Sequence, residues 1–322
     1  MSSPFDIAVH VLWFECEALS PIHLMAGAGG QIRGALWEAL SRLTCPDPKA
    51  RGVPEHTAHC PLCRLMHLET VSPRGVNPAR PFAVRPPLTR RAEEPHTYEP
   101  GHVFRFGINL FGSGADTIPY IVQAVYRLGA AGIGKGRGRF RLNSVREENP
   151  FIGIERLLYK EGGQMQPPSR PLTATDVCAA AELHPSDVVT LRFITPTQVI
   201  EKGKPLDHPQ PQPLIARLLE RCQSLEAMYT NELSDPTIWR TRHFEMIAAS
   251  EAVQVARDDT RWIDVWSSSG RTGYRDNIGG FVGAITLKGN LEKLRYWLTY
   301  GQLLHIGKNA VKGSGWYEIL HH

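Results

Sequence analysis

One design occurs twice in the chain: IVQAVYRLGAAGIGKGRGRFRLNSV (121–145) and LEKLRYWLTYGQLLHIGKNAVKGSGWYEI (291–319). In each stretch a short amphipathic helix leads into a glycine-rich basic loop, and the loop leads into a strand. Because the two copies lie near the ends of two halves of similar length, the pattern predicts a duplicated fold.

The two loops have the composition of a polyanion-binding surface. Glycine lets the backbone adopt positive φ and approach a ligand closely, and the interleaved cations place positive charge where that backbone is exposed. Residues 127–146 contain six basic side chains and no acidic one. Neither loop ends in Gly-Lys-Ser/Thr, and both follow a helix where a nucleotide-triphosphate loop follows a strand. We therefore expect them to bind a nucleic-acid backbone.

The segments around the loops predict an α+β fold of two tandem ferredoxin-like domains. In the first half the expected elements are a strand from residue 5 to 13, a helix over 31–43, a strand over 102–112, a helix over 119–129 and a strand over 140–145. In the second half they are strands over 188–200, 261–266 and 279–289 and helices over 213–229 and 291–300. The predicted domains are 1–146, with a cysteine-rich insertion at 45–67, and 188–320, joined by 147–187. The proline-dense stretch 73–100 is expected to lie over the surface as an irregular segment.

Length and composition limit the cellular setting. At 322 residues and a net charge of +4, the chain is long enough for two domains with cores of their own. It has no run of about 18 apolar residues, so we expect no membrane association and a cytoplasmic protein. In a cytoplasmic protein the six cysteines are expected to be free thiols or metal ligands rather than disulfides.

A metal-binding pattern lies in CPDPKARGVPEHTAHCPLC (45–63). Cys60 and Cys63 form a C-x2-C turn that directs two thiolates at one point, and Cys45 with a histidine can complete a tetrahedral zinc shell. Either His56 or His59 can supply that fourth ligand. The segment has many prolines and few apolar residues, so a structural zinc ion would explain how it folds. A free-thiol loop is the alternative.

Several motifs, in this order along the chain, resemble those of one protein family. They are QIRGALWEALSRL (31–43) followed by CPLCRL (60–65), the loop GIGKGRGRF (132–140), TPTQVIEKGKPL (195–206) and above all residues 279–319. Together they resemble the CRISPR precursor-RNA processing endoribonucleases of the RAMP superfamily. The resemblance implies two ferredoxin-like domains that bind CRISPR repeat RNA and cut it once per repeat to give crRNA.

The reaction that this resemblance implies uses no metal or other cofactor. The ribose 2′-hydroxyl attacks the adjacent phosphate, the 5′-oxygen leaves, and a 2′,3′-cyclic phosphate forms. Such chemistry needs a base, an acid and a cation near the phosphorane, for which histidine and lysine or arginine are suited.

The resemblance also directs the choice of catalytic candidates. It implies a catalytic histidine in or just before the first helix; helix 31–43 has none, and His23 in the preceding loop is the nearest. His305 is the second candidate, because it opens HIGKNAVKGSG beside Lys308. Tyr274 is a further candidate for assisting the transition state.

RNA binding is assigned to cations in the two loops and near them. The candidates are Arg33, Lys135, Arg137, Arg139, Arg271, Arg275, Lys308 and Lys312. Arginines of the proline-dense stretch are plausible helpers in specificity: Arg74, Arg80, Arg85, Arg90 and Arg91.

Two other functions compete with the endoribonuclease. A non-catalytic RAMP subunit that binds guide RNA in a CRISPR effector complex would use the same fold and the same loops. A zinc-dependent nuclease or deaminase fits least, because no H-x-E element accompanies Cys60.

Overall fold

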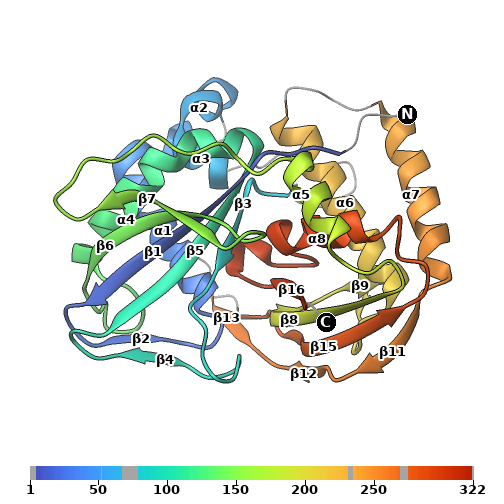
Figure 1. Cartoon of the computed structure of the whole chain (residues 1–322). Helices are drawn as coiled ribbons and strands as arrows, with labels where there is room; N and C mark the ends of the chain where they lie inside the picture. The colour runs from blue at the N-terminus through green and yellow to red at the C-terminus, as the bar shows by residue number, and fades with distance from the viewer. Residues whose placement is uncertain (1–4, 52, 67–78, 231–234, 269–274, 321–322) are drawn as a thin grey trace.

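The computed structural model describes residues 5–51, 53–66, 79–230, 235–268 and 275–320. Two sheets, one in each half of the chain, form its framework, and the two halves lie side by side (Figure 1). None of the described helices is long and apolar enough to cross a membrane.

The first sheet is antiparallel, with its strands in the order β3-β5-β1-β6-β7. They are β1 (Val9–Ala18), β3 (Phe82–Arg85), β5 (Val103–Phe111), β6 (Phe140–Asn149) and β7 (Ile154–Lys160). Helices α1 (Ala28–Thr44) and α4 (Ile118–Ala131) connect the strands and pack against each other. Helix α1 forms because Ile32, Leu36 and Leu40 recur on one buried face. Without β7, the order of the strands is that of a ferredoxin-like unit, as the sequence predicts.

The second sheet repeats this topology, with the order β11-β15-β8-β16. Its strands are β8 (Val188–Thr197), β11 (Gln254–Asp258), β15 (Gly280–Lys288) and β16 (Tyr317–Leu320), and β12 (Arg261–Ile263) also pairs with β15. The helices are α6 (Pro211–Tyr229), α7 (Pro236–Glu251) and α8 (Arg295–Leu304). In both sheets the first strand of the unit lies between the third and the fourth, so the duplication is confirmed.

Shorter elements complete the described chain. Three two-stranded ribbons are β2 (Ile22–Leu24) with β4 (His96–Tyr98), β9 (Ile200–Glu201) with β10 (Lys204–Pro205), and β13 (Trp266–Ser268) with β14 (Arg275–Asn277). The other helical segments are η1 (Pro48–Ala50), α2 (Pro54–His59), α3 (Pro61–Met66), η2 (Gly112–Thr117), α5 (Ala174–Glu182) and η3 (Ala310–Lys312).

The first strand of the chain belongs to two hydrophobic cores. Leu12, Phe14 and Cys16 of β1 are buried in a cluster with residues of α1 and α4. Val9 and Val11 belong instead to a cluster formed mainly by the second domain. Side chains alternate between the faces of a strand, so β1 buries one face in its own domain and the other face toward the second domain.

Buried hydrogen bonds reinforce the contact between the domains. The Tyr300 hydroxyl on α8 donates to the Ile7 carbonyl at 2.8 Å and accepts from the Ile7 amide at 3.0 Å. The Asn109 side chain on β5 donates to the Leu303 carbonyl at 2.6 Å. The buried apolar interface and these hydrogen bonds together fix the relative position of the two domains.

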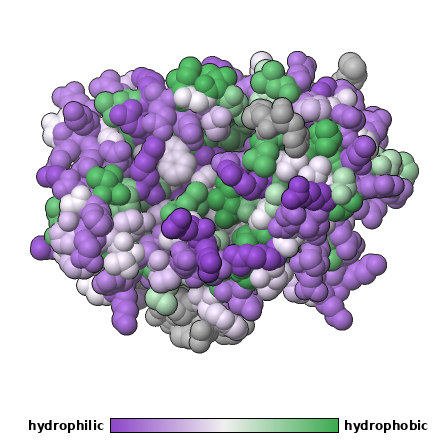
Figure 2. Space-filling view, turned by 60° about the horizontal axis from the view of Figure 1, so that its bottom comes forward, coloured by the Kyte–Doolittle hydropathy of each residue, from purple (hydrophilic) through white to green (hydrophobic). Residues whose placement is uncertain are grey.

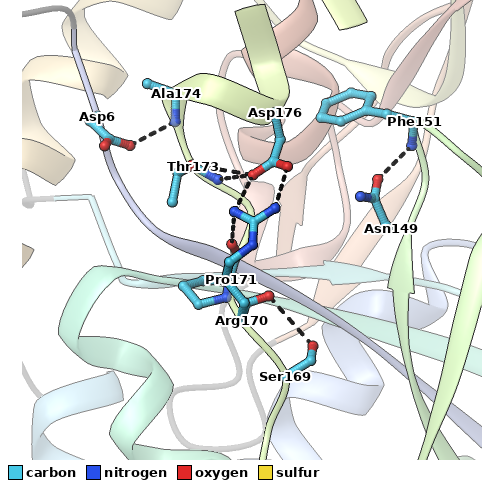
Figure 3. Close-up of polar contacts among 9 residues, drawn as sticks. All are labelled: Asp6, Asn149, Phe151, Ser169, Arg170, Pro171, Thr173, Ala174 and Asp176. Carbon is cyan, nitrogen blue, oxygen red and sulfur yellow. Dashed lines mark hydrogen bonds and ion pairs between the residues drawn. The ribbon is translucent and has the colours of Figure 1, made fainter. Parts of the chain in front are cut away.

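The connecting segment 147–187 is ordered by its own contacts. Strand β7 extends the first sheet, and a capping box between Thr173 and Asp176 starts α5. Figure 3 shows Arg170 donating to both Asp176 oxygens, at 2.6 and 2.8 Å, while Asp6 accepts from the Ala174 amide at 2.8 Å. Helix α5 packs against α8, so this segment ties the start of the chain to the second domain. The domain boundaries stay predictions.

The expectation of an irregular surface segment at 73–100 is wrong for its middle. Residues 82–85 form β3, an edge strand of the first sheet whose four residues are all buried. The flanking prolines hide this strand from a periodicity argument, and only pairing with β5 reveals it. Arg85 is accordingly 4% exposed and stacks between Trp13 and Trp316, so its side chain is not available as an RNA contact.

Candidate nucleic-acid interface

The small ribbon β2–β4 carries an exposed histidine beside a basic residue. His23 pairs across the ribbon with Thr97 on one side and with Lys135 on the other. Residues directly opposite each other in antiparallel strands point to the same face, so the three side chains form one row. Ile22 and Leu24 point inward and are buried, which leaves His23 exposed. The Thr97 hydroxyl lies 3.5 Å from Nδ1 of His23.

The glycine-rich loop at 132–139 is held against β2 by its backbone. The Lys135 amide donates to the His23 carbonyl at 2.9 Å. Gly134 has φ 74°, and a Cβ there would lie 2.3 Å from the same carbonyl oxygen, so only glycine fits. The amides of Gly134 and Gly136 donate to no group within the described ranges. Two free amides in a turn with left-handed residues are suited to bind an anion.

The cations of this loop differ in how far other residues neutralise them. Lys135 and Arg139 are exposed, and no described carboxylate forms an ion pair with either. Arg137 lies 3.2 Å from Glu38 of α1. Lys135 and Arg139 are therefore the exposed cations of this loop that no described carboxylate neutralises.

The corresponding loop of the second domain faces inward. Loop 305–315 packs on α1, where a Cβ on Gly29 would lie 2.2 Å from the Lys312 carbonyl oxygen. Its amides are largely used within the protein; for example, Lys308 donates to Gln198 at 3.0 Å and Gly315 donates to Pro196 at 3.0 Å. The two loops share a sequence pattern but not a role: the second one mainly joins the domains.

His305 lies inside this second loop and is 0% exposed. Its Nδ1 lies 3.2 Å from the Ser314 carbonyl oxygen, so this nitrogen carries the proton, and its ring stacks on Trp316 at 6.3 Å. Burial, with Arg85 and Arg221 nearby, holds the pKa of His305 well below its usual value, so the ring is neutral. A base or acid must reach the RNA, and this burial denies His305 that access. In this structure His305, named above as a catalytic candidate, is therefore not placed to contact RNA.

The remaining candidates for RNA binding are divided among several positions. Lys308 is exposed, whereas Lys312 and Arg33 are half-buried on either side of the contact between α1 and the second loop. Burial lowers the pKa of Lys312 and of Arg33, and Arg80 adds to the effect on Arg33. Arg275 lies in β14, where its backbone pairs with Ser268. Arg271 and Tyr274, like Arg74, lie outside the described residues.

Two clefts lie near the N-terminus of α1. The first, of about 300 Å³, lies between the domains. Its walls include apolar residues and four cations: Pro87, Leu88, Val265, Val282, Arg90, Arg91, Arg261 and Lys312. The second, of about 290 Å³, lies between α1, loop 132–137 and β13. Gly27 lines both clefts, so they meet at the N-terminus of α1. Figure 2 shows a face on which strongly hydrophilic side chains gather in the middle beside small hydrophobic patches.

Tertiary structure adds residues that the sequence did not single out. Thr97 and His96 come from β4, a three-residue strand within the proline-dense stretch. Thr97 lies opposite His23, and His96 lines the first cleft. Burial lowers the pKa of His96, which keeps its ring neutral. No pattern in a three-residue strand could have identified them.

The cysteine-rich insertion brings four metal-ligating side chains together. The ligand atoms of Cys45, His56, Cys60 and Cys63 all lie within 4.8 Å of one another. His59 is exposed and does not belong to this group. The four residues could hold a metal ion, and His56 is the histidine that the fold places among the thiols.

The fold and the interface define a duplicated ferredoxin-like protein with one exposed basic loop among the described residues. Residues 191–317 match the family model described as CRISPR-associated endoribonuclease Cas6, and residues 7–171 match AF_1859_N, N-terminal domain. The second domain therefore belongs to the CRISPR-associated Cas6 family of endoribonucleases. Among curated proteins, no sequence matches it.

Solved structures of this family share the fold. The Thermus thermophilus Cas6 protein TTHB231 is similar with a TM-score of 0.55 and 16% identity, over 98% of this chain and 99% of that one. A product complex of Cas6 (TTHB231) has a TM-score of 0.59 and 17% identity, over 97% and 100% of the two chains. A partial Cas6-RT-Cas1–Cas2 complex has a TM-score of 0.60 and 12% identity, over 100% of this chain and 47% of that one.

Proposed function

We propose that the chain binds CRISPR repeat RNA and cuts it once per repeat by attack of the RNA's own 2′-hydroxyl. Family membership supports the substrate class, as does the product complex of Cas6 (TTHB231). The observation that carries the chemistry is the row of Thr97, His23 and Lys135 beside the free amides of Gly134 and Gly136.

The reaction needs two proton transfers. The 2′-oxygen loses its proton and bonds to phosphorus, the bond from phosphorus to the 5′-oxygen breaks, and the 5′-oxygen takes up a proton. The products are a 2′,3′-cyclic phosphate and a 5′-hydroxyl. His23 performs one of these transfers, because it is exposed and its imidazole ring can both accept and donate a proton.

The phosphorane gains negative charge as it forms. The ammonium group of Lys135, on the same face as His23, is positioned to offset that charge. The amides of Gly134 and Gly136 would donate to the non-bridging oxygens. In this proposal no metal takes part in the cleavage. The Cys/His cluster begins with Cys45 at the C-terminus of α1, whereas the two clefts lie at the N-terminus of that helix.

The first cleft is proposed to receive an unpaired nucleotide of the repeat. Its apolar walls are suited to a base, and Arg90, Arg91 and Lys312 are suited to the flanking phosphates. Neither Arg90 nor Arg91 forms an ion pair with a described carboxylate, whereas Arg261 pairs with Glu93.

A labelled repeat RNA from the same genome tests the proposal. In EDTA, at an unchanged circular dichroism spectrum, we expect cleavage to continue and to yield a cyclic phosphate. An RNA with one 2′-deoxy nucleotide 5′ of the cut should bind equally well and remain intact. Cleavage of the deoxy RNA, or loss of cleavage in EDTA from a folded protein, would contradict the mechanism.

A second function stays open to the same experiment. The Cas6-RT-Cas1–Cas2 complex contains a chain similar to this one, which supports association with a CRISPR complex. If the protein binds its repeat tightly and never cuts it, the chain is a non-catalytic RNA-binding subunit of such a complex.

A further inference from the structure

The cysteine-rich insertion has no hydrophobic core of its own between its first two cysteines. None of the described residues between Cys45 and Cys60 is buried. Helix α2 spans Pro54–His59, has no buried residue, and is too short to be stable alone. Something other than apolar packing must therefore hold this segment in place.

The four ligand atoms have the spacing of a tetrahedral zinc shell. Bonds of about 2.3 Å to sulfur and about 2.0 Å to nitrogen place two ligand atoms about 3.5–3.8 Å apart. Cys45 Sγ lies 3.9 Å from Cys63 Sγ and 3.3 Å from Nε2 of His56. The sulfurs of Cys45 and Cys63 are too far apart for a disulfide, and all four residues sit within 4.8 Å.

A nearby arginine balances the charge of such a site. Zn²⁺ with three thiolates and one neutral imidazole carries a net charge of −1. Arg51 Nε donates to Cys45 Sγ at 3.4 Å, and Nη2 donates to Ser41 Oγ at 2.7 Å. The guanidinium also stacks on Trp37 at 5.0 Å, so the same residue links the cluster to α1. A charged partner for a thiolate is typical of an outer shell.

We propose that Cys45, His56, Cys60 and Cys63 bind one Zn²⁺ in a closed, four-coordinate site. Cys45 caps the C-terminus of α1, and the other three ligands come from α2, α3 and the residue between them. The ion ties the insertion to the last turn of α1. Because the protein fills all four positions, the site is structural and offers no place for a substrate.

Elemental analysis of the full chain without a histidine tag tests this directly. Protein purified without chelators should contain about one zinc per chain. Reaction of the thiols with a mercurial should release that zinc, which a metal-sensitive dye detects. Replacement by Co²⁺ should give the absorption of a tetrahedral thiolate site. Absence of zinc from the folded wild-type protein would overturn the proposal.

Matched variants assign the ligands. His56→Ala and Cys63→Ser should each lower the zinc content by more than half, whereas His59→Ala and Cys178→Ser should retain about one ion. Should a ligand variant fail to fold, the cobalt spectrum of the wild-type protein still decides the ligand set. Equal zinc loss in His59→Ala and His56→Ala, or a cobalt spectrum without thiolate absorption, would refute the assignment.

Discussion

At the scale of single residues, the two candidate histidines differ in exposure. His23 stands on the surface between Thr97 and Lys135, while His305 is enclosed by the second loop and Trp316. Proton transfer to RNA requires contact with RNA, so exposure favours His23. The structure thus distinguishes, by exposure, two histidines that the sequence analysis named as catalytic candidates.

His23→Ala is expected to slow single-turnover cleavage by a factor on the order of 10²–10⁴, the usual contribution of one acid or base. Affinity for an uncleavable 2′-deoxy repeat should change little. His102→Ala, another exposed histidine, is the matched control and should cleave at the wild-type rate. A His23→Ala rate within a few-fold of wild type would remove His23 from the mechanism.

His305 is expected to act on stability. Its folded pKa lies below the value of about 6.5 in an unfolded chain, so the unfolded state binds the extra proton first. The free energy of unfolding should therefore fall as pH drops below about 6.5, by at most about 1.4 kcal/mol per pH unit. Urea unfolding at several pH values would measure this.

The variant His305→Asn should be less stable at pH 8 and should lose that part of the pH slope. Its cleavage rate per folded molecule should stay close to wild type. A large drop in rate in a fully folded His305→Asn protein would instead give His305 a role in the reaction.

At the scale of elements, the two glycine-rich loops share a sequence pattern but pack differently. Loop 132–139 lies along the ribbon β2–β4 and leaves amides and cations free. Loop 305–315 packs between α1 and β3, and amides of this loop donate to Pro196 at the end of β8 and to Gln198 just after it. Because its amides and cations are free, loop 132–139 is the one that we propose binds phosphate.

Removing two cations tests that assignment. Lys135→Ala with Arg139→Ala should weaken RNA binding and reduce the slope of log K against log salt by about 1.5, because each lost phosphate contact removes about 0.7–0.9. A titration by fluorescence anisotropy at several salt concentrations measures it. Lys204→Ala, an exposed lysine on β10, is the control and should leave the slope unchanged. An unchanged slope in the double variant would place the RNA elsewhere.

At the scale of the whole molecule, the proposed RNA surface depends on how the domains meet. The N-terminus of α1 lines both clefts, and the second loop lies directly on it. The clefts therefore keep their shape only while this contact persists.

Two glycines of one helix form a matched test. Gly29→Ala would place a Cβ 2.2 Å from the Lys312 carbonyl oxygen, and we expect a cost of about 1–3 kcal/mol and weaker RNA binding. Gly34→Ala meets nothing within 4 Å, so it should stabilise the protein by about 0.5–1 kcal/mol. Thermal unfolding compares the two. A Gly29→Ala protein as stable as Gly34→Ala would show that the domains do not need this contact.

The sequence alone determined the features that depend on local pattern. Period-two and helical spacing predicted most of the strands and helices, the repeated helix, loop and strand predicted the duplication, and C-x2-C predicted where thiols meet. Only the tertiary structure decided the rest. It placed β3 in the first sheet as a buried edge strand, and it placed His56, and not His59, among the three thiols. It left one basic loop exposed and packed the other between the domains, so that His23 is exposed and His305 is buried. The physical reason is that exposure and pairing depend on which distant segment packs against a residue, and local spacing carries no information about that segment.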